Sequence, residues 1–184
     1  MWEYGVPKED VLRERNSWED MTFIGIITKS KKETEIKQAL NNLFENMEIK
    51  HTIVLINNKS IENIKNVKFD TIIIDINDLN YGKDITNIIS NSNRVIINLD
   101  YDENLVLIEN LELNAITYGM NSKSTLTISS SNPEYALVTL QRCIKDINGK
   151  ILEPQEVKVD INKNNKNLYL SMILAIFLLI YGKI

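Results

Sequence analysis

The sequence predicts an α/β domain with a mostly parallel, Rossmann-like or P-loop-like sheet flanked by helices. Short, uninterrupted apolar runs alternate with segments of helical period, as is typical of parallel strands that are buried on both faces. After Gly119 the pattern changes to period-two alternation, which indicates a small appended antiparallel sheet. The last segment is apolar on every face and predicts a C-terminal helix.

Length and composition are those of one globular domain. The chain has 184 residues, of which 43% are hydrophobic and 25% charged. We divide it into an N-terminal segment, 1–20, and an α/β domain, 21–184, with an antiparallel sub-sheet at 119–161 and a terminal helix at 167–182. The first segment predicts a short helix after Pro7, and its Trp2 and Trp18 are expected to dock onto the domain or a partner.

Charge and rare residues exclude several classes of function. The net charge of −4 and the absence of a Lys/Arg cluster argue against nucleic acid as a partner. Cys143 is the only cysteine, so no intrachain disulfide forms, and we expect a cytoplasmic protein. His51 is the only histidine and precedes a strand, which favours a structural role over catalysis or metal binding.

The predicted parallel strands are apolar and rich in β-branched residues. A helix is expected after the first strand, because apolar residues recur with helical period at 36, 39, 40, 43 and 44. A weak helix or turn is expected at 60–67. Another helix is expected between the fourth and fifth strands. Ligands of parallel sheets bind at the carboxyl ends of the strands, which lie here at 28–32, 57, 75–77 and 98–102. The five strands are expected at 23–28, 52–56, 71–74, 95–97 and 115–118.

The antiparallel part is predicted from three alternating runs, at 125–130, 135–146 and 156–161. Asn148 and Gly149 stand between the last two runs. Both residues tolerate a positive φ, so this dipeptide predicts a hairpin turn.

The terminal helix is expected at 168–181. About 14 helical residues span ~21 Å, which is short of the ~20 residues needed to cross a bilayer core. We therefore predict a helix buried in the domain, with a membrane tail anchor as the alternative.

The stretch from Arg94 to Ser131 carries a family resemblance. A buried strand ends in N-L-D-Y-D-E, a helix follows, and the next strand ends in T-Y-G before a polar, alternating strand. This order resembles the late central domain of the Mur ligases, the ATP-dependent amide-forming enzymes of peptidoglycan synthesis. The resemblance implies that Asn98 and Asp100 lie in a turn at a strand end.

The same resemblance extends to the segment T-K-S-K-K-E-T at 28–34. In the family this position holds the phosphate-binding loop G-T-x-G-K-[T/S]. The resemblance implies nucleotide-binding roles for Lys32, at the phosphate lysine, and for Thr34. Thr28 and Lys31 stand where the glycines belong and obstruct a close backbone approach to phosphate, so the loop is degenerate. The alternative is a lysine-rich helix start.

Two further positions follow from the resemblance. Asp75 stands at a strand end where the family has a magnesium-binding Glu, which implies a metal role. The alternative is that Asp75 and Asp78 simply cap the turn. Asn167 matches the first Asn of the family helix that faces adenine, while Leu170 replaces the second. The segment that holds the second magnesium has no counterpart. ATP and Mg²⁺ are therefore implied only if activity is retained.

We predict from these residues a non-catalytic Mur-ligase-like binding or regulatory protein, linked to cell-envelope synthesis. It is expected to work with a protein partner or as a homo-oligomer. One alternative is an ATP-dependent ligase-like enzyme that retains nucleotide binding through Lys32, Asp75 and Asn167. The other is a cytoplasmic-face protein that is membrane-associated through residues 168–181.

Overall fold

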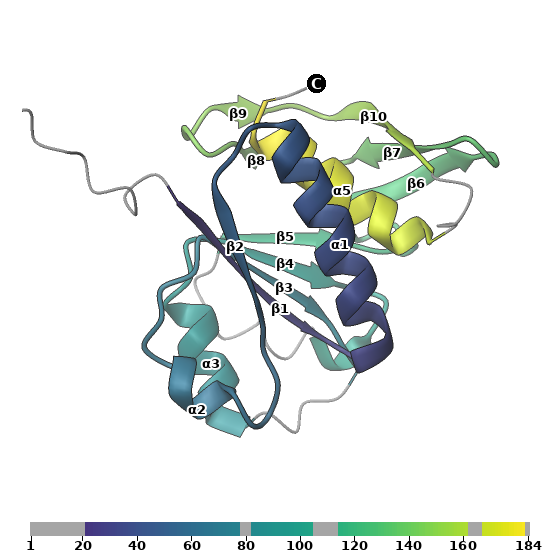
Figure 1. Ribbon diagram of the computed structural model, residues 1–184. Coiled ribbons are helices and arrows are strands. Elements are labelled where there is room, and N and C mark those ends of the chain that lie inside the picture. Colours follow the sequence, from purple (N-terminus) through teal and green to yellow (C-terminus); the bar gives the residue numbers. More distant parts are fainter. Residues whose placement is uncertain (1–20, 78–81, 105–113, 162–166, 183–184) are drawn as a thin grey trace, which may run out of the picture.

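The computed structural model describes residues 21–77, 82–104, 114–161 and 167–182 (Figure 1). The predicted fold class is confirmed: an eight-stranded, mixed but mostly parallel sheet is flanked by helices, beside a small two-stranded antiparallel sheet. The predictions for the N-terminal segment with Trp2 and Trp18, for Asp78, and for most of the helix between the fourth and fifth strands fall outside the described residues.

The parallel half of the sheet contains all five predicted strands. They are β1 (Thr22–Thr28), β2 (His51–Leu55), β3 (Thr71–Asp75), β4 (Val95–Asn98) and β5 (Ala115–Tyr118). Their order in space is β2-β1-β3-β4-β5. The chain thus adds strands on one side of β1 and then on the other, and this reversal places the topological switch point of the sheet between β1 and β3.

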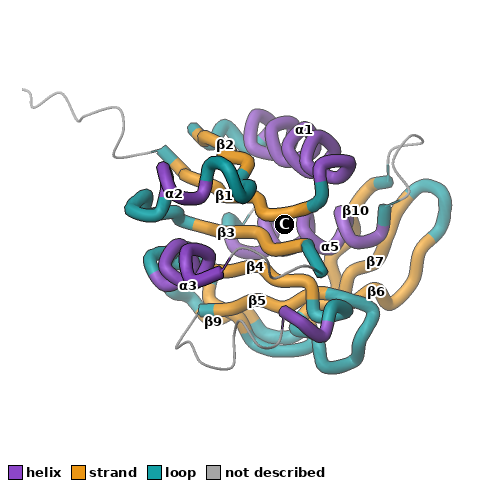
Figure 2. The backbone as a smooth tube through the Cα atoms, turned by 90° about the horizontal axis from the view of Figure 1, so that it is seen from below, coloured by secondary structure: helices purple, strands orange, loops and turns teal. Residues whose placement is uncertain are grey.

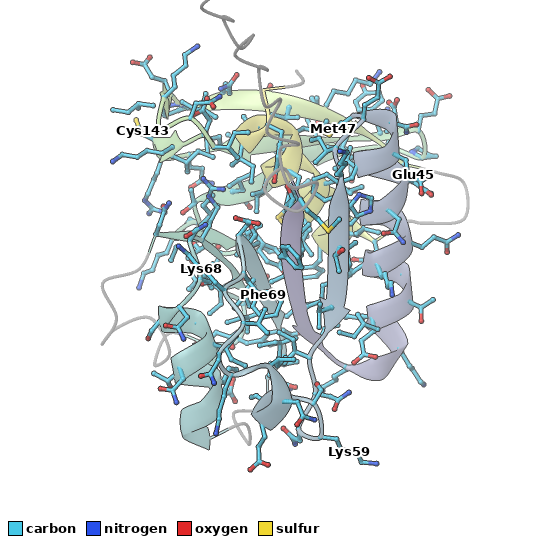
Figure 3. The ribbon with its side chains drawn as sticks, turned by 60° about the vertical axis from the view of Figure 1, so that its left-hand side comes forward. Glu45, Met47, Lys59, Lys68, Phe69 and Cys143 are labelled. Carbon is cyan, nitrogen blue, oxygen red and sulfur yellow. The ribbon has the colours of Figure 1, made fainter. Side chains whose placement is uncertain are left out.

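The helices lie on both faces because crossovers that run in opposite directions along a sheet are both right-handed. Helix α1 (Ser30–Asn46) and helix α5 (Leu168–Ile180) cover one face, and α2 (Ile61–Ile64) and α3 (Gly82–Ser90) cover the other (Figure 2). Each face has its own hydrophobic core. Phe69 lies inside the second core, whereas Cys143 lies at the surface (Figure 3).

The antiparallel strands extend the parallel sheet. Strands β6 (Leu126–Ser131), β7 (Tyr135–Leu140) and β10 (Gln155–Asp160) follow β5 in the order β5-β6-β7-β10. The run predicted at 135–146 is divided in two, because its end forms β8 (Ile144–Lys145) and pairs with β9 (Ile151–Leu152) in the separate small sheet. The hairpin predicted at Asn148-Gly149 joins these two strands, and Gly149 has the positive φ of 82°.

The end of α1 is stabilised by a pattern that its sequence does not reveal. Glu48 adopts the left-handed conformation (φ 56°) that usually requires glycine. The amide of Glu48 donates to the Glu45 carbonyl at 3.1 Å, and the amide of Ile49 donates to the Phe44 carbonyl at 2.9 Å. These are the two bonds of a Schellman motif, and they turn the chain directly into β2.

Helix α5 is buried between the sheet and α1, as the sequence predicts for a core helix. It packs on β5, β6, β7 and β10 on one side and on α1 on the other (Figure 1). Phe177 is fully buried and meets the ring of Phe44 edge-on at 5.3 Å between centroids. Packing on these two sides buries nine residues of the helix. No helix within the described ranges has the length and apolarity needed to cross a membrane.

Candidate functional site

Polar side chains gather at the carboxyl ends of β1, β3, β4 and β5, the edge where ligands of such sheets bind. Figure 1 shows that α1 begins at this edge, directly after β1. We call the group formed by Lys32, Asp75, Asn98, Asp100 and Tyr169 the carboxyl-edge cluster.

Asp75 is the centre of this cluster and is only 2% exposed. Its Oδ2 accepts a hydrogen bond from Nζ of Lys32 at 2.9 Å, and its Oδ1 accepts one from Nδ2 of Asn98 at 2.8 Å. The Asp75 carbonyl also accepts from the hydroxyl of Thr28 at 3.0 Å. Each oxygen of the buried carboxylate therefore already has a donor from the protein.

The electrostatics of Lys32 reflect this pairing. Partial burial by itself lowers the pKa of the ammonium group, because burial penalises the charged form. The hydrogen bond and the charge of Asp75 outweigh this penalty, with a smaller contribution from Tyr101, and the pKa of Lys32 is raised above its ordinary value. The ammonium also lies 5.6 Å from the centre of the Tyr169 ring. Lys32 is thus charged and engaged inside the protein.

Asp100 joins the turn after β4 to the turn after β5. Its carboxylate accepts hydrogen bonds from the amides of Met120 and Asn121, at 2.7 and 3.1 Å, and from the hydroxyl of Tyr169 at 3.0 Å. Gly119 permits this approach, because a Cβ at its position would lie 2.7 Å from Oδ1 of Asp100 and its φ is +156°. The glycine of the T-Y-G strand end is therefore required by the fold of the cluster.

Asn98, which the sequence places in a turn, is completely buried. Its Oδ1 accepts from the amide of Asp100 at 3.0 Å, and its carbonyl accepts from Nδ2 of Asn104 at 2.7 Å. Asn98 thus holds the turn after β4 and contacts Asp75 at the same time. Asn98 is the last residue of β4, and its contact with the Asp100 amide lies in the turn that follows.

The connection from β1 to α1 is a single residue, Lys29, with extended backbone (φ −72°, ψ 141°). Lys31 and Lys32 already belong to the helix, and among the described non-glycine residues only Glu48 has a positive φ. A phosphate loop instead uses a glycine-rich segment whose amides wrap around the phosphate. This connection supplies no such wrapping segment.

Thr34 and Asn167 lie apart from the Lys32–Asp75 pair. Both line a groove of about 880 Å³ between α1, β10 and α5. Asn167 caps α5, since its Oδ1 accepts from the amides of Tyr169 and Leu170 at 3.1 and 3.3 Å, and its Nδ2 donates to Glu35 at 3.3 Å. The Asn predicted to face adenine thus serves here as a helix cap that also contacts α1.

The cluster does not fit a magnesium ion in this arrangement. Both oxygens of Asp75 are bonded to protein donors, and the described residues contain no group of three or more His, Cys, Asp or Glu side chains that is suited to a metal. His51 is tied to the fold, with Nδ1 2.9 Å from the Ile49 carbonyl, Nε2 3.0 Å from Oδ1 of Asn41, and its ring stacked on Phe44.

Three residues in or beside the carboxyl-edge cluster, Asn104, Tyr118 and Tyr169, are not predicted as functional residues from the sequence. Tyr169 begins an apolar helix and Tyr118 ends an apolar strand, so both read as core residues. Asn104 is one of many asparagines, which makes it uninformative by type. The position of Tyr118 at a strand end is the signal that could have indicated it.

Tyr118 is fully buried, and its hydroxyl makes no hydrogen bond of ordinary geometry in the described structure. Burial, followed by the nearby charge of Asp75, raises the pKa of this phenol well above its ordinary value of 10.0. The unfolded chain therefore releases this proton at a lower pH than the folded chain does. Its contribution to stability is complete below pH 10 and falls as the pH rises through the folded pKa.

We expect Tyr118→Phe to leave the free energy of unfolding at pH 7 unchanged within about 1 kcal/mol, because the hydroxyl makes no hydrogen bond of ordinary geometry with the described residues. Above pH 10 the variant should lose stability less steeply than the parent protein. Urea unfolding followed by circular dichroism across this pH range measures both effects. Tyr135→Phe, on the half-buried side of β7, is the control. Equal alkaline slopes for Tyr118→Phe and the parent would contradict the assignment.

No known family model matches this chain. A search of curated proteins likewise finds no significant match.

Proposed function

We propose that the chain is a non-catalytic relative of the Mur ligase central domain, which acts as a binding or regulatory protein with a partner protein or a second copy. Its setting in this proposal is the cytoplasmic side of cell-envelope synthesis. The family assignment rests on the residues from Arg94 to Ser131 and on the order of strands and helices that they encode.

The observation that carries the non-catalytic role is the pairing of Lys32 with Asp75 at 2.9 Å. Phosphoryl transfer depends on cations that are positioned on phosphate and magnesium. Here the residue at the phosphate-lysine position is neutralised by the residue at the magnesium position. Lys32 and Asp75 therefore neutralise each other's charge at the edge of the sheet where a nucleotide would bind.

The short connection between β1 and α1 supports the same proposal. With only Lys29 between strand and helix, the backbone offers no loop to surround a triphosphate. Glu33 in the first turn of α1 adds a negative charge near the helix N-terminus, where a phosphate would need positive potential.

We expect no binding heat in the micromolar range when Mg²⁺-ATP is titrated into the protein in a calorimeter. Asp75→Asn tests whether the charge of Asp75 is what keeps Lys32 from binding phosphate. The substitution removes that charge and keeps an acceptor for the side chain of Asn98. Lys31→Ala, an exposed lysine in the same helical turn, is the control. Micromolar binding that is lost in Lys32→Ala and retained in Lys31→Ala would reject the proposal.

That rejecting result would favour the second candidate, an enzyme that retains nucleotide binding. The convergence of Lys32, Asp75 and Asn98 at the ligand-binding edge of the sheet is the observation in its favour. In that case the Lys32–Asp75 pair would open when nucleotide binds. The tail-anchor alternative has less support, because α5 is buried within the domain.

A further inference from the structure

A cavity lies at the opposite edge of the sheet, where the parallel strands begin. Its volume is about 490 Å³, within the size range of small-molecule sites. Residues preceding or starting β1, β3, β4 and β5 form its floor, and the β8–β9 hairpin forms its side. In Figure 1 this hairpin stands on the side where β1 begins. None of these residues belongs to the carboxyl-edge cluster.

Arg94 is the central charged residue of this cavity. It is only 8% exposed, and it comes directly before β4. Its Nη2 donates to the carbonyls of Lys145 and Asp146, at 3.3 and 3.2 Å, which attaches the hairpin to the sheet. Its Nε is buried without a hydrogen-bond partner, and no ion pair of Arg94 occurs within the described residues.

No carboxylate of the described residues lies within ion-pair distance of this guanidinium. Burial lowers the pKa of Arg94, and the nearby carboxylates of Asp146 and Asp70 compensate for it only in part. Arginine nevertheless stays protonated in proteins, so the charge remains. A carboxylate is the group that best matches the planar donors of a guanidinium.

Two aspartates in the cavity wall limit what else the ligand can carry. Asp70 lies before β3, and its oxygens accept from the Phe23 amide at 2.8 Å and from Nδ2 of Asn93 at 3.1 Å. Asp146 uses Oδ1 for the amides of Asn148 and Lys150, at 2.8 Å each, while its Oδ2 makes no bond within the described residues. These carboxylates repel a polyanion such as a nucleotide and attract a cationic group.

The wall also offers apolar contact. Ile147, which is 50% exposed, lines the cavity together with the side chains of Met21 and Tyr181. The Tyr181 hydroxyl lies 3.2 Å from the Thr22 hydroxyl. The cavity thus combines the buried Arg94, the exposed Lys145, two carboxylates and apolar side chains.

We propose that this cavity binds a small zwitterion of the amino-acid class, with its carboxylate on Arg94, its ammonium facing Asp70 and Asp146, and an apolar side chain against Ile147. This proposal does not depend on whether the carboxyl-edge cluster binds a nucleotide, because the cavity lies at the other end of the strands. Binding here would join the β8–β9 hairpin more firmly to the sheet, since Arg94 contacts both.

The test is a set of titrations of the full-length protein with the protein L-amino acids, one at a time at millimolar concentration, followed by two-dimensional ¹H–¹⁵N NMR. Amide signals of Ile147 and Gly149 are expected to shift with at least one apolar amino acid. For L-leucine, the matched probes are 4-methylpentanoate, which lacks the ammonium, and 3-methylbutylamine, which lacks the carboxylate. The corresponding analogues serve for any other amino acid that binds. Both analogues should bind about tenfold or more weakly, because each loses a charge-assisted contact.

Two variants locate the site. Asp146→Asn keeps the acceptor for the hairpin amides and removes the charge, and Arg94→Lys keeps the charge and removes the planar fork. Each should weaken amino-acid binding about tenfold or more. Arg142→Lys is the matched control, since Arg142 also donates to two backbone carbonyls but lies outside the cavity. Circular dichroism establishes that each variant is folded, and if Arg94→Lys is not, Asp146→Asn decides.

Several outcomes overturn the proposal. These are no shift with any amino acid, shifts confined to residues away from the hairpin, equal binding by a carboxylate-only analogue, or unchanged affinity in Asp146→Asn.

Discussion

Deletion of residues 168–184 is expected to abolish folding, giving an aggregated or unfolded chain. Nine residues of α5 are buried, from Leu170 to Ile180, and the helix joins α1 to the strands β5, β6, β7 and β10. Each large apolar side chain that is buried contributes roughly 1.5–3 kcal/mol, against a typical total stability of ~5–15 kcal/mol. The loss of the whole helix therefore exceeds what the domain can tolerate.

A point variant makes the same prediction quantitative. Phe177→Ala should lower the free energy of unfolding by about 3–5 kcal/mol, because it leaves a cavity beside Phe44 and Tyr181. Ile151→Ala is the control, since Ile151 is 61% exposed on β9, and it should change stability by less than ~0.5 kcal/mol. Urea unfolding followed by far-ultraviolet circular dichroism measures both variants.

The deletion also distinguishes a core helix from a membrane anchor. If residues 168–181 were an anchor, the truncated protein would stay folded and become more soluble. Cell fractionation together with circular dichroism of the truncated protein would detect that behaviour, and such a result would reject the core assignment.

Lys32→Met is expected to lower the free energy of unfolding by about 2–4 kcal/mol, because it leaves the buried Asp75 carboxylate without its cation. This loss in the free energy of unfolding is smaller than is typical when a fully buried ion pair is broken, because the Lys32 side chain is itself 32% exposed. The double variant Lys32→Met/Asp75→Asn should recover much of the loss, because no unpaired charge then remains and the new amide oxygen can still accept from Asn98. Lys31→Met is the control, and it should lie within ~0.5 kcal/mol of the parent.

The pH dependence of this pair has a definite sign. Because the folded pKa of Lys32 is raised above 10.5, its contribution is complete below that pH and is lost as the pH rises through the folded value. The difference in stability between the parent and Lys32→Met should therefore be constant near neutral pH and should shrink in strong alkali. A single-variant loss below ~0.5 kcal/mol at pH 7 would show that the pair is not a structural element.

Local patterns in the sequence were sufficient to predict the five parallel strands and the terminal helix. Runs such as Ile72 to Ile74 are buried on both sides, so their residues must all be apolar, and this requirement is visible without a structure. The approach of Lys32, Asp75 and Asn98 was foreseeable in the same way, because the carboxyl ends of adjacent parallel strands meet at one edge. Glu48 shows the limit of such patterns, since it takes a left-handed conformation that only the completed turn stabilises.

The sequence by itself thus determined which segments are strands and helices and which polar residues stand at strand ends, since these properties depend on near neighbours in the chain. The tertiary structure decided which donors those residues receive. It placed Tyr169 beside Lys32 and Asp100, although 69 positions separate Tyr169 from Asp100. It also covered α5 with α1, joined β6, β7 and β10 to the parallel sheet, and buried Arg94 beneath the β8–β9 hairpin. These arrangements depend on contacts between distant segments, and such contacts form only when the whole sheet is assembled.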